Sequence, residues 1–242
     1  MNWQVDIGGR DSVSLKRIGM DMKTFFQGLS RLGLSLALTA ALHAADTIRF
    51  DALPGSKMRI EGTSSIHDWQ VESKLIGGFL EAGSGFPVEP GQSVQPGKVD
   101  AKVEAFVPVR SLKSLEKDGK PYSDSMDSVM REKMKEPAEP RALYHLTELT
   151  LKESPKATDA AYLFDSTGQL IVAGVTNTIS MPVSVTPLGD KKIKITGNTS
   201  VKMTQFGIQP PAPAIALGMI KTGDEVKLIF EWMVGQKAMS AK

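Results

Sequence analysis

Short runs of alternating apolar and polar residues fill most of the chain from Ile48 onward, separated by clusters of Gly, Pro, Asn and Asp. The clearest run covers residues 99–107, where Val or Ala holds every odd position and a charged residue holds positions 100, 102 and 104. Successive residues of a strand point to opposite faces, so this run has one dry and one wet face. Residues 193–197 and 227–232 alternate in the same way. The pattern predicts an all-β fold built from antiparallel strands.

Turn-forming residues predict where these strands reverse. Residues 165–168 and 188–191 carry Gly with Asp, Ser or Lys between apolar runs, and each predicts a hairpin turn. Residues 81–97 and 209–213 are rich in Gly and Pro and predict longer loops. Roughly eight or nine strands result, which fits either a sandwich or a closed barrel; closure would remove exposed strand edges. Periodicity alone leaves both architectures open.

One segment has helical spacing. Between residues 124 and 135, Met126, Val129, Met130 and Met134 recur at intervals of three and four among charged residues. Ser123 is available as the N-terminal cap, and the helix must end before Pro137. A methionine face usually packs on a core, although thioethers also suit a surface that adapts to flexible apolar ligands.

The first 44 residues have the layout of a bacterial signal peptide preceded by an upstream extension. Lys23 and Arg31 supply positive charge, the run Leu32–Leu42 is apolar, and Leu42-His43-Ala44 resembles a cleavage site. A buried N-terminal helix is the alternative interpretation. The run is about half the roughly 20 residues that a membrane-spanning helix needs. We therefore expect no permanent membrane span, cleavage after Ala44, a mature domain at 45–242, and a periplasmic or secreted location.

Charge and cysteine content narrow the function classes. Residues 1–44 hold five of the 29 Lys and Arg and three of the 27 Asp and Glu, so the remainder carries no net charge. An excess of positive charge is what phosphate-backbone binding requires, and a nucleic-acid partner is not expected. The chain has no Cys, so an exported domain of this length must be held together by its core. The sequence leaves the oligomeric state open, a homodimer included.

Residues for catalysis or metal binding are scarce. Beyond residue 44 only His67 and His145 remain as imidazoles, and neighbouring strand residues such as His67 and Asp68 point to opposite faces. No Gly-x-Ser-x-Gly motif and no phosphate-binding Gly loop occur. The segment Ser64–Trp69 is better explained as a structural corner in which hydroxyls bond local backbone and Trp69 fills one end of the core. We expect no catalytic residues, no metal and no cofactor; an enzyme that uses His67 and Asp68 is the weakest alternative.

Several segments resemble the YceI-like family in order and spacing. The string Gly62-Thr63-Ser64-Ser65-Ile66-His67-Asp68-Trp69 is similar to the opening of one branch of that family. The later segments that carry the resemblance are the helix from Met126 with Glu139–Tyr144, Gly168–Thr176, Met181–Val183, Thr204–Ile208 and Lys221–Val226. The likeness extends over roughly Ile48 to Val234. The Gly/Pro segment near residues 81–97 and the His-Asp-Trp opening depart from the pattern of many members.

The resemblance implies an antiparallel lipocalin-like β-barrel with one short helix between strands, whose lumen holds a lipid or polyisoprenoid chain. Strand parity and the family pattern together suggest which side chains face the lumen or close its ends: Trp69, Phe79, Val103, Met126, Met130, Met181, Met203, Phe206, Leu228, Phe230 and Trp232. A barrel of this size can also be packed solid, in which case the chain would be a protein-interaction or envelope-stress module without a lipid. Parity does not separate the two.

Overall fold

The structure is a computed structural model that describes residues 47–155, 157, 160–212 and 220–236. The expected signal peptide and Pro213 lie outside these residues. The strands are β1 (Ile48–Ala52), β2 (Lys57–Ser64), β3 (Trp69–Ser73), β4 (Gly77–Ala82), β5 (Gly97–Lys98), β6 (Ala101–Pro108), β7 (Lys113–Leu115), β8 (Arg141–Glu153), β9 (Tyr162–Val172), β10 (Val175–Gly189), β11 (Lys192–Lys202) and β12 (Thr222–Gly235). The helices are α1 (Asp124–Lys133) and the 3₁₀ turns η1 (Val109–Ser111) and η2 (Met203–Phe206).

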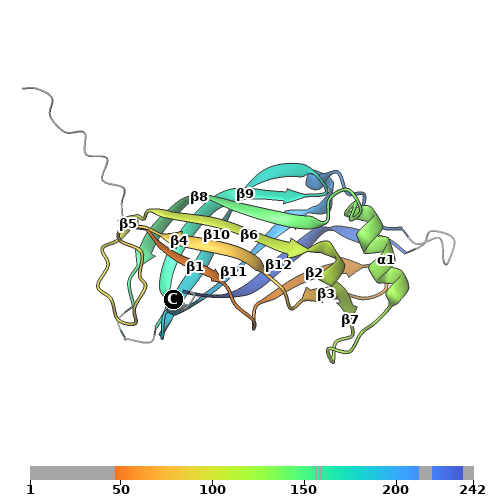
Figure 1. Cartoon of the computed structure of the whole chain (residues 1–242). Coiled ribbons are helices and arrows are strands. Elements are labelled where there is room, and N and C mark those ends of the chain that lie inside the picture. The colour runs from red at the N-terminus through yellow and green to blue at the C-terminus, as the bar shows by residue number, and fades with distance from the viewer. Residues whose placement is uncertain (1–46, 156, 158–159, 213–219, 237–242) are drawn as a thin grey trace, which may run out of the picture. The chain divides into compact units, whose positions relative to one another are not determined.

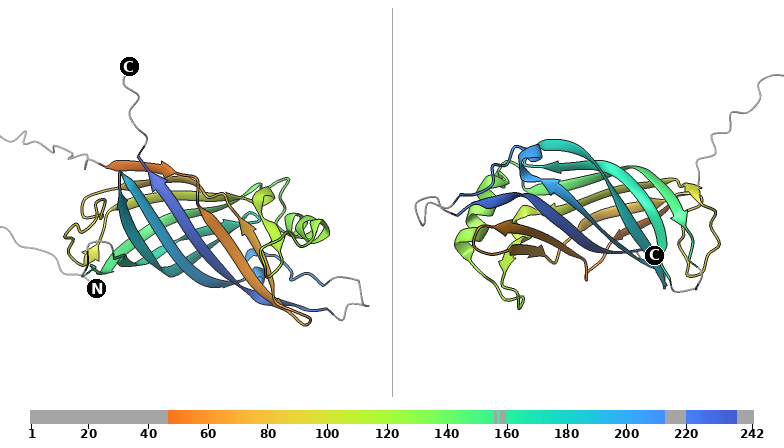
Figure 2. Two further views of the ribbon diagram at one scale, coloured as in Figure 1. Left: turned by 90° about the horizontal axis from the view of Figure 1, so that it is seen from below. Right: turned by 180° about the vertical axis from the view of Figure 1, so that it is seen from behind.

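The strands close into an antiparallel barrel. Among the described residues the path runs β1-β4-β6-β8-β9-β10-β11-β12, and β12 pairs back to β1 through Ala52↔Val234. Figures 1 and 2 show these strands slanting around a common axis. The predicted all-β, lipocalin-like barrel with one short helix is confirmed, and the sandwich alternative is wrong. Closure of the sheet decides between barrel and sandwich, because each of these eight strands pairs with a strand on both sides.

The two ends of the barrel differ. At one end the sheet continues from β12 through β2 and β3 to β7, beside α1 (Figure 1); we call this the helix end. At the other end the short β5 pairs with β8 after an irregular segment, residues 83–96; we call this the loop end. The predicted loop at 81–97 is therefore confirmed, apart from the last residues of β4 and the start of β5.

One of the two predicted hairpin turns is wrong. Strand β9 runs unbroken through residues 165–168, and the chain reverses instead at Ala173 and Gly174, which both have positive φ. Ser166 and Gly168 follow the inward alternation of Phe164 and Leu170, so their polar or small character reflects the barrel interior and not a turn. The turn predicted at 188–191 is confirmed, since β10 ends at Gly189 and β11 begins at Lys192.

The predicted helix is confirmed and ends two residues early, at Lys133. The Ser123 hydroxyl accepts a hydrogen bond from the Met126 amide at 3.3 Å and caps the first turn. Its helical face differs from the prediction, because Val129 is exposed whereas Asp127 is buried. No helix in the described part of the chain is long and apolar enough to cross a membrane.

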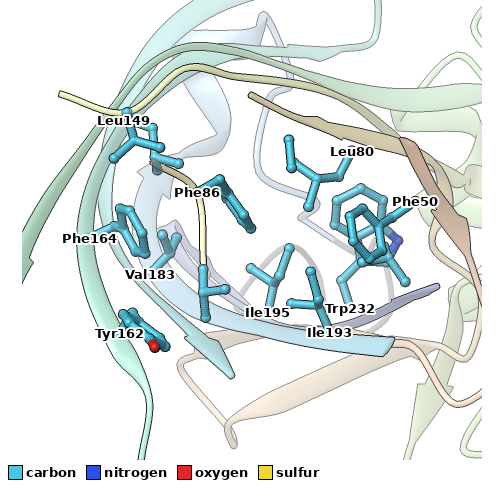
Figure 3. Packing of buried hydrophobic residues seen from close by; sticks show 14 of the residues in the cluster. Phe50, Leu80, Phe86, Leu149, Tyr162, Phe164, Val183, Ile193, Ile195 and Trp232 are labelled. Atoms are coloured by element: carbon cyan, nitrogen blue, oxygen red, sulfur yellow. The ribbon is translucent and has the colours of Figure 1, made fainter. Parts of the chain in front are cut away.

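Buried apolar side chains form two clusters. One gathers toward the loop end and includes Phe50, Leu80, Tyr162 and Trp232, whose side chains are drawn in Figure 3. The other gathers toward the helix end and includes Val71, Leu112, Phe206 and Leu228. The two clusters fill the ends of the barrel, so any space for a ligand must lie between them.

Candidate functional site

An internal cavity of about 140 Å³ lies in the lumen. Members of both core clusters line it, among them Leu80, Trp232 and Leu228. Its walls come from strands all around the barrel, from Met58 of β2 to Phe230 of β12. The volume is close to that of the roughly 150 Å³ apolar cavity that stays dry and binds benzene in an engineered protein. The barrel is therefore not packed solid.

The cavity exists because several inward-facing positions carry small side chains. Ala105, Ser166 and Thr199 lie on the inner faces of β6, β9 and β11 and border the cavity. Inward residues at this level, such as Met181 and Phe230, keep partial accessibility, whereas Val185 and Trp232 nearer the loop end are buried. Along each strand, the inward-facing side chains thus change from half-buried in the middle of the barrel to buried near the loop end. The hollow therefore lies in the middle of the barrel.

The cavity wall carries no charge. None of its lining side chains is Asp, Glu, Lys, Arg or His, and the polar ones are Tyr144, Ser166, Thr199 and Trp232. The Ser166 hydroxyl donates to the Met181 carbonyl at 2.9 Å, so the wall itself satisfies it. An ionised group would lose its hydration in such a space without gaining a partner. The wall thus suits the uncharged, apolar part of a molecule.

Two buried donors in this wall have no hydrogen-bond partner among the described residues: the Tyr144 hydroxyl and the Trp232 indole N–H. Burial raises the pKa of Tyr144, and the nearby Ser166 side chain offsets part of that rise without completing a hydrogen bond. Both polar atoms are almost completely covered by neighbouring atoms. They therefore add little polarity to the surface that a ligand would touch.

The loop end is closed by residues 83–96, which we call the cap. Phe86 reaches in from the cap beside Phe164 (Figure 3), with the two rings stacked at 6.0 Å between centroids, and it also borders the cavity. The Tyr162 hydroxyl donates to the Gln92 carbonyl at 2.5 Å, and the Ser154 hydroxyl donates to the Val94 carbonyl at 2.7 Å. Phe86 is thus an apolar stopper on a segment that polar contacts hold to the barrel.

The helix end is closed by α1 and η2. Asp127 of α1 is 3% exposed, accepts from the Ser114 amide at 2.7 Å and forms an ion pair with Lys113 at 3.0 Å. Burial acts to raise the pKa of Asp127, but these hydrogen bonds and the ammonium group more than offset it and lower the pKa. The sequence gives no sign of this role, since an Asp three residues before Met130 looks like part of a solvated helix face.

The structure distributes the eleven predicted site residues over four places. Val103, Met181, Leu228, Phe230 and Trp232 border the cavity. Met130, Met203 and Phe206 pack in the cluster at the helix end, where Trp69 also contributes. Met126 and Trp69 border a surface groove next to β7. Phe79 lies on the outer face under the Arg49 guanidinium, 3.8 Å from its ring centroid, because its neighbour Leu80 is the inward residue.

The Ser64–Trp69 segment forms the structural corner that the sequence predicts. The Ser64 hydroxyl accepts from the amides of Ile66 and His67 and lies 2.7 Å from the His67 carbonyl. The Trp69 indole donates to the Thr63 carbonyl at 3.1 Å. Within the described ranges, no three His, Asp or Glu side chains converge as a metal site would require.

Comparisons with known proteins agree with this architecture. A family model described as "YceI-like domain" matches residues 68–233. A polyisoprenoid binding domain from Saccharophagus degradans, 11% identical, aligns over 79% of this chain and 99% of its own with a TM-score of 0.57. Burkholderia cenocepacia BcnA, 15% identical, aligns over 74% and 95% with a TM-score of 0.49. No curated protein sequence matches the chain significantly. At 11% identity the likeness to the Saccharophagus degradans domain establishes the fold alone.

Proposed function

Because the chain belongs to the YceI-like family, we propose that it is an exported binding protein that holds a lipid or polyisoprenoid chain in the barrel lumen. The observation that carries the proposal is the uncharged cavity in the middle of a closed barrel. Each methylene group moved from water into such a space contributes about 0.8 kcal/mol, so a chain can bind without a charged anchor. The solved relative described as polyisoprenoid-binding supports this choice of ligand class.

The size of the cavity sets a condition on binding. At about 140 Å³ it takes only a short part of a long chain, so the lumen must widen as the chain enters. Met58 and Met181 border the space, and their unbranched thioethers can change rotamer at little cost. Phe86 borders it from the cap, and outward movement of the cap would join the cavity to solvent at the loop end. Widening through these residues leaves the strand pairing intact.

The hollow middle distinguishes this proposal from the packed-barrel alternative. A packed barrel would bury Val103, Met181 and Phe230 as completely as Val185 and Trp232, but these three remain half-buried. The one titratable side chain of the wall, Tyr144, has a buried hydroxyl whose pKa burial raises, so the wall offers a substrate no accessible group for general acid–base chemistry. Binding without chemistry fits both features.

Native mass spectrometry of the full chain, expressed in a bacterium with its own N-terminus and purified from the periplasm, tests the proposal. We expect a stoichiometric apolar adduct that solvent extraction releases and lipid analysis identifies as a long chain. A clean unliganded mass, with no adduct after incubation with polyprenols, would overturn the proposal and leave an interaction module. Recovery of the protein only from the cytoplasm would overturn the export part alone.

A further inference from the structure

Two glycines on the inner face of the barrel lie under aromatic rings from a neighbouring strand. Gly197 of β11 pairs directly with Phe230 of β12, and a Cβ atom at 197 would lie 2.8 Å from both Cε1 and Cζ of that ring. Gly168 of β9 lies under Tyr144 of β8, where a Cβ atom would lie 2.5 Å from the ring's Cζ. Both rings border the cavity. Each ring therefore occupies space at the wall that a side chain would otherwise fill.

We propose that Gly197 sets the bore of the lumen and thereby selects the width of the chain that binds. This inference rests on the proposed function, because it concerns the same cavity. Carbon atoms do not approach within 3 Å, so a methyl group at 197 would displace the Phe230 ring. Along β12 the ring is flanked on the same face by Leu228 and Trp232, and Met58 pairs with it on the other side. The remaining direction is the cavity.

Gly197 tests the idea more cleanly than Gly168. A Cβ atom at 168 would also lie 2.6 Å from the His145 carbonyl oxygen, so the wall itself would have to move. At 197 the nearest backbone atom is the Pro182 carbonyl oxygen at 3.1 Å, a contact that a shift of a few tenths of an ångström relieves. The main response to Gly197→Ala is thus movement of a side chain that is free to move inward.

A narrower bore penalises branched chains more than linear ones. A methyl-branched isoprenoid is wider than an unbranched acyl chain, and the inward movement of Phe230 removes width and not length. Gly197 consequently favours isoprenoid over linear chains in the wild-type protein. If the displaced ring excludes two methylene equivalents from apolar contact, the affinity for an isoprenoid falls roughly 15-fold.

The experiment compares the wild-type full chain with Gly197→Ala, Phe230→Leu and the double variant. Xenon NMR measures the cavity without reference to any natural ligand, since dry apolar cavities of this size take up xenon. Displacement of the dye N-phenylnaphthylamine by geranylgeraniol or by hexadecanol measures binding of a branched and a linear chain. We expect Gly197→Ala to reduce xenon uptake, to weaken the binding of geranylgeraniol roughly 15-fold, and to weaken the binding of hexadecanol less. The double variant should recover xenon uptake and both affinities.

Gly223→Ala, also in β12, is the matched control, because a Cβ atom at 223 would likewise lie too close to a neighbouring side chain, 2.4 Å from the Thr63 hydroxyl oxygen, while neither residue borders the cavity. It should leave xenon uptake and both affinities unchanged. Equal xenon uptake and equal affinities for Gly197→Ala and wild type would overturn the inference. Should Gly197→Ala fail to fold, Phe230→Leu must raise xenon uptake, and no rise would overturn it. Xenon uptake that depends on residue 197 without isoprenoid binding would support the bore and refute the proposed function.

Discussion

Phe86 is the side chain whose truncation should open the loop end of the lumen most directly. It is 3% exposed, borders the cavity and stacks on Phe164, while Gln92 and Val94 tie its segment to the barrel through other contacts. Replacing a buried Phe by Ala costs about 3 to 5 kcal/mol in a core. Because the cap can relax, we expect a loss near the lower limit, about 3 kcal/mol of the free energy of unfolding. The cap should remain attached through its polar contacts.

Loss of the ring should also speed ligand entry. The stacked pair of Phe86 and Phe164 contributes about 0.5 to 1.5 kcal/mol beyond its buried area. If the barrier to opening of the cap falls by the upper value, opening becomes roughly tenfold faster. Stopped-flow mixing of Phe86→Ala with N-phenylnaphthylamine measures the association rate, and urea unfolding measures stability. Phe79→Ala is the control, since Phe79 lies on the outer face under Arg49. Identical association rates for wild type and Phe86→Ala, with the stability loss present, would show that ligands enter elsewhere and refute this reasoning.

Three further predictions concern buried polar groups and processing. Asp127→Asn should lower the free energy of unfolding at pH 7 by about 1 to 3 kcal/mol, because it breaks the ion pair with Lys113. The fold lowers the pKa of Asp127, so the stability advantage of the wild type over the variant should vanish as the pH falls through that pKa. Urea titrations at a series of pH values measure this difference. Tyr144→Phe should leave stability unchanged or raise it by up to about 1 kcal/mol at neutral pH, because the hydroxyl is buried without a partner among the described residues. Burial raises the pKa of Tyr144 and also that of Tyr162, which the variant keeps, so the wild type should lose more stability than the variant as the pH rises from the unfolded toward the folded pKa. Terminal sequencing of protein from the periplasm should begin at Ala45, and a start within residues 1–44 would contradict the cleavage prediction.

Alternation along the chain sufficed to predict most of the strands and their inward faces. Of the predicted run 99–107, residues 101–107 form β6, and Val103 and Ala105 point into the barrel. The error at residues 165–168 has a physical cause. Ser166 and Gly168 resemble turn residues, yet one bonds the neighbouring strand and the other makes room for Tyr144. Local composition does not distinguish a turn from a small residue that the interior requires.

The candidate site was predictable in part. Five of the eleven predicted residues border the cavity. Alternation along a strand predicts them, because once one inward-facing residue is known, every second residue of that strand faces inward as well. Phe79 was placed on the wrong face because its run, Gly77–Ala82, lacks a clear alternation of polar and apolar residues. Asp127 gave no signal at all, since its partners, Ser114 and Lys113, belong to a strand that precedes the helix.

The sequence by itself determined the all-β class, the position and cap of the single helix, and the uncharged character of the inward faces. These are local properties, since they follow from alternation, helical spacing and residue type within a few positions. Alternation left closure open and the family resemblance predicted it, but only the tertiary structure showed the closing pairing of β1 with β12 and the hollow in the middle of the barrel. The hollow depends on which small residues from β6, β9 and β11 meet at one level of the barrel, and on Gly197 lying beneath Phe230. Side chains from several strands that are distant in sequence together set the width of the lumen, so no single run of residues predicts it.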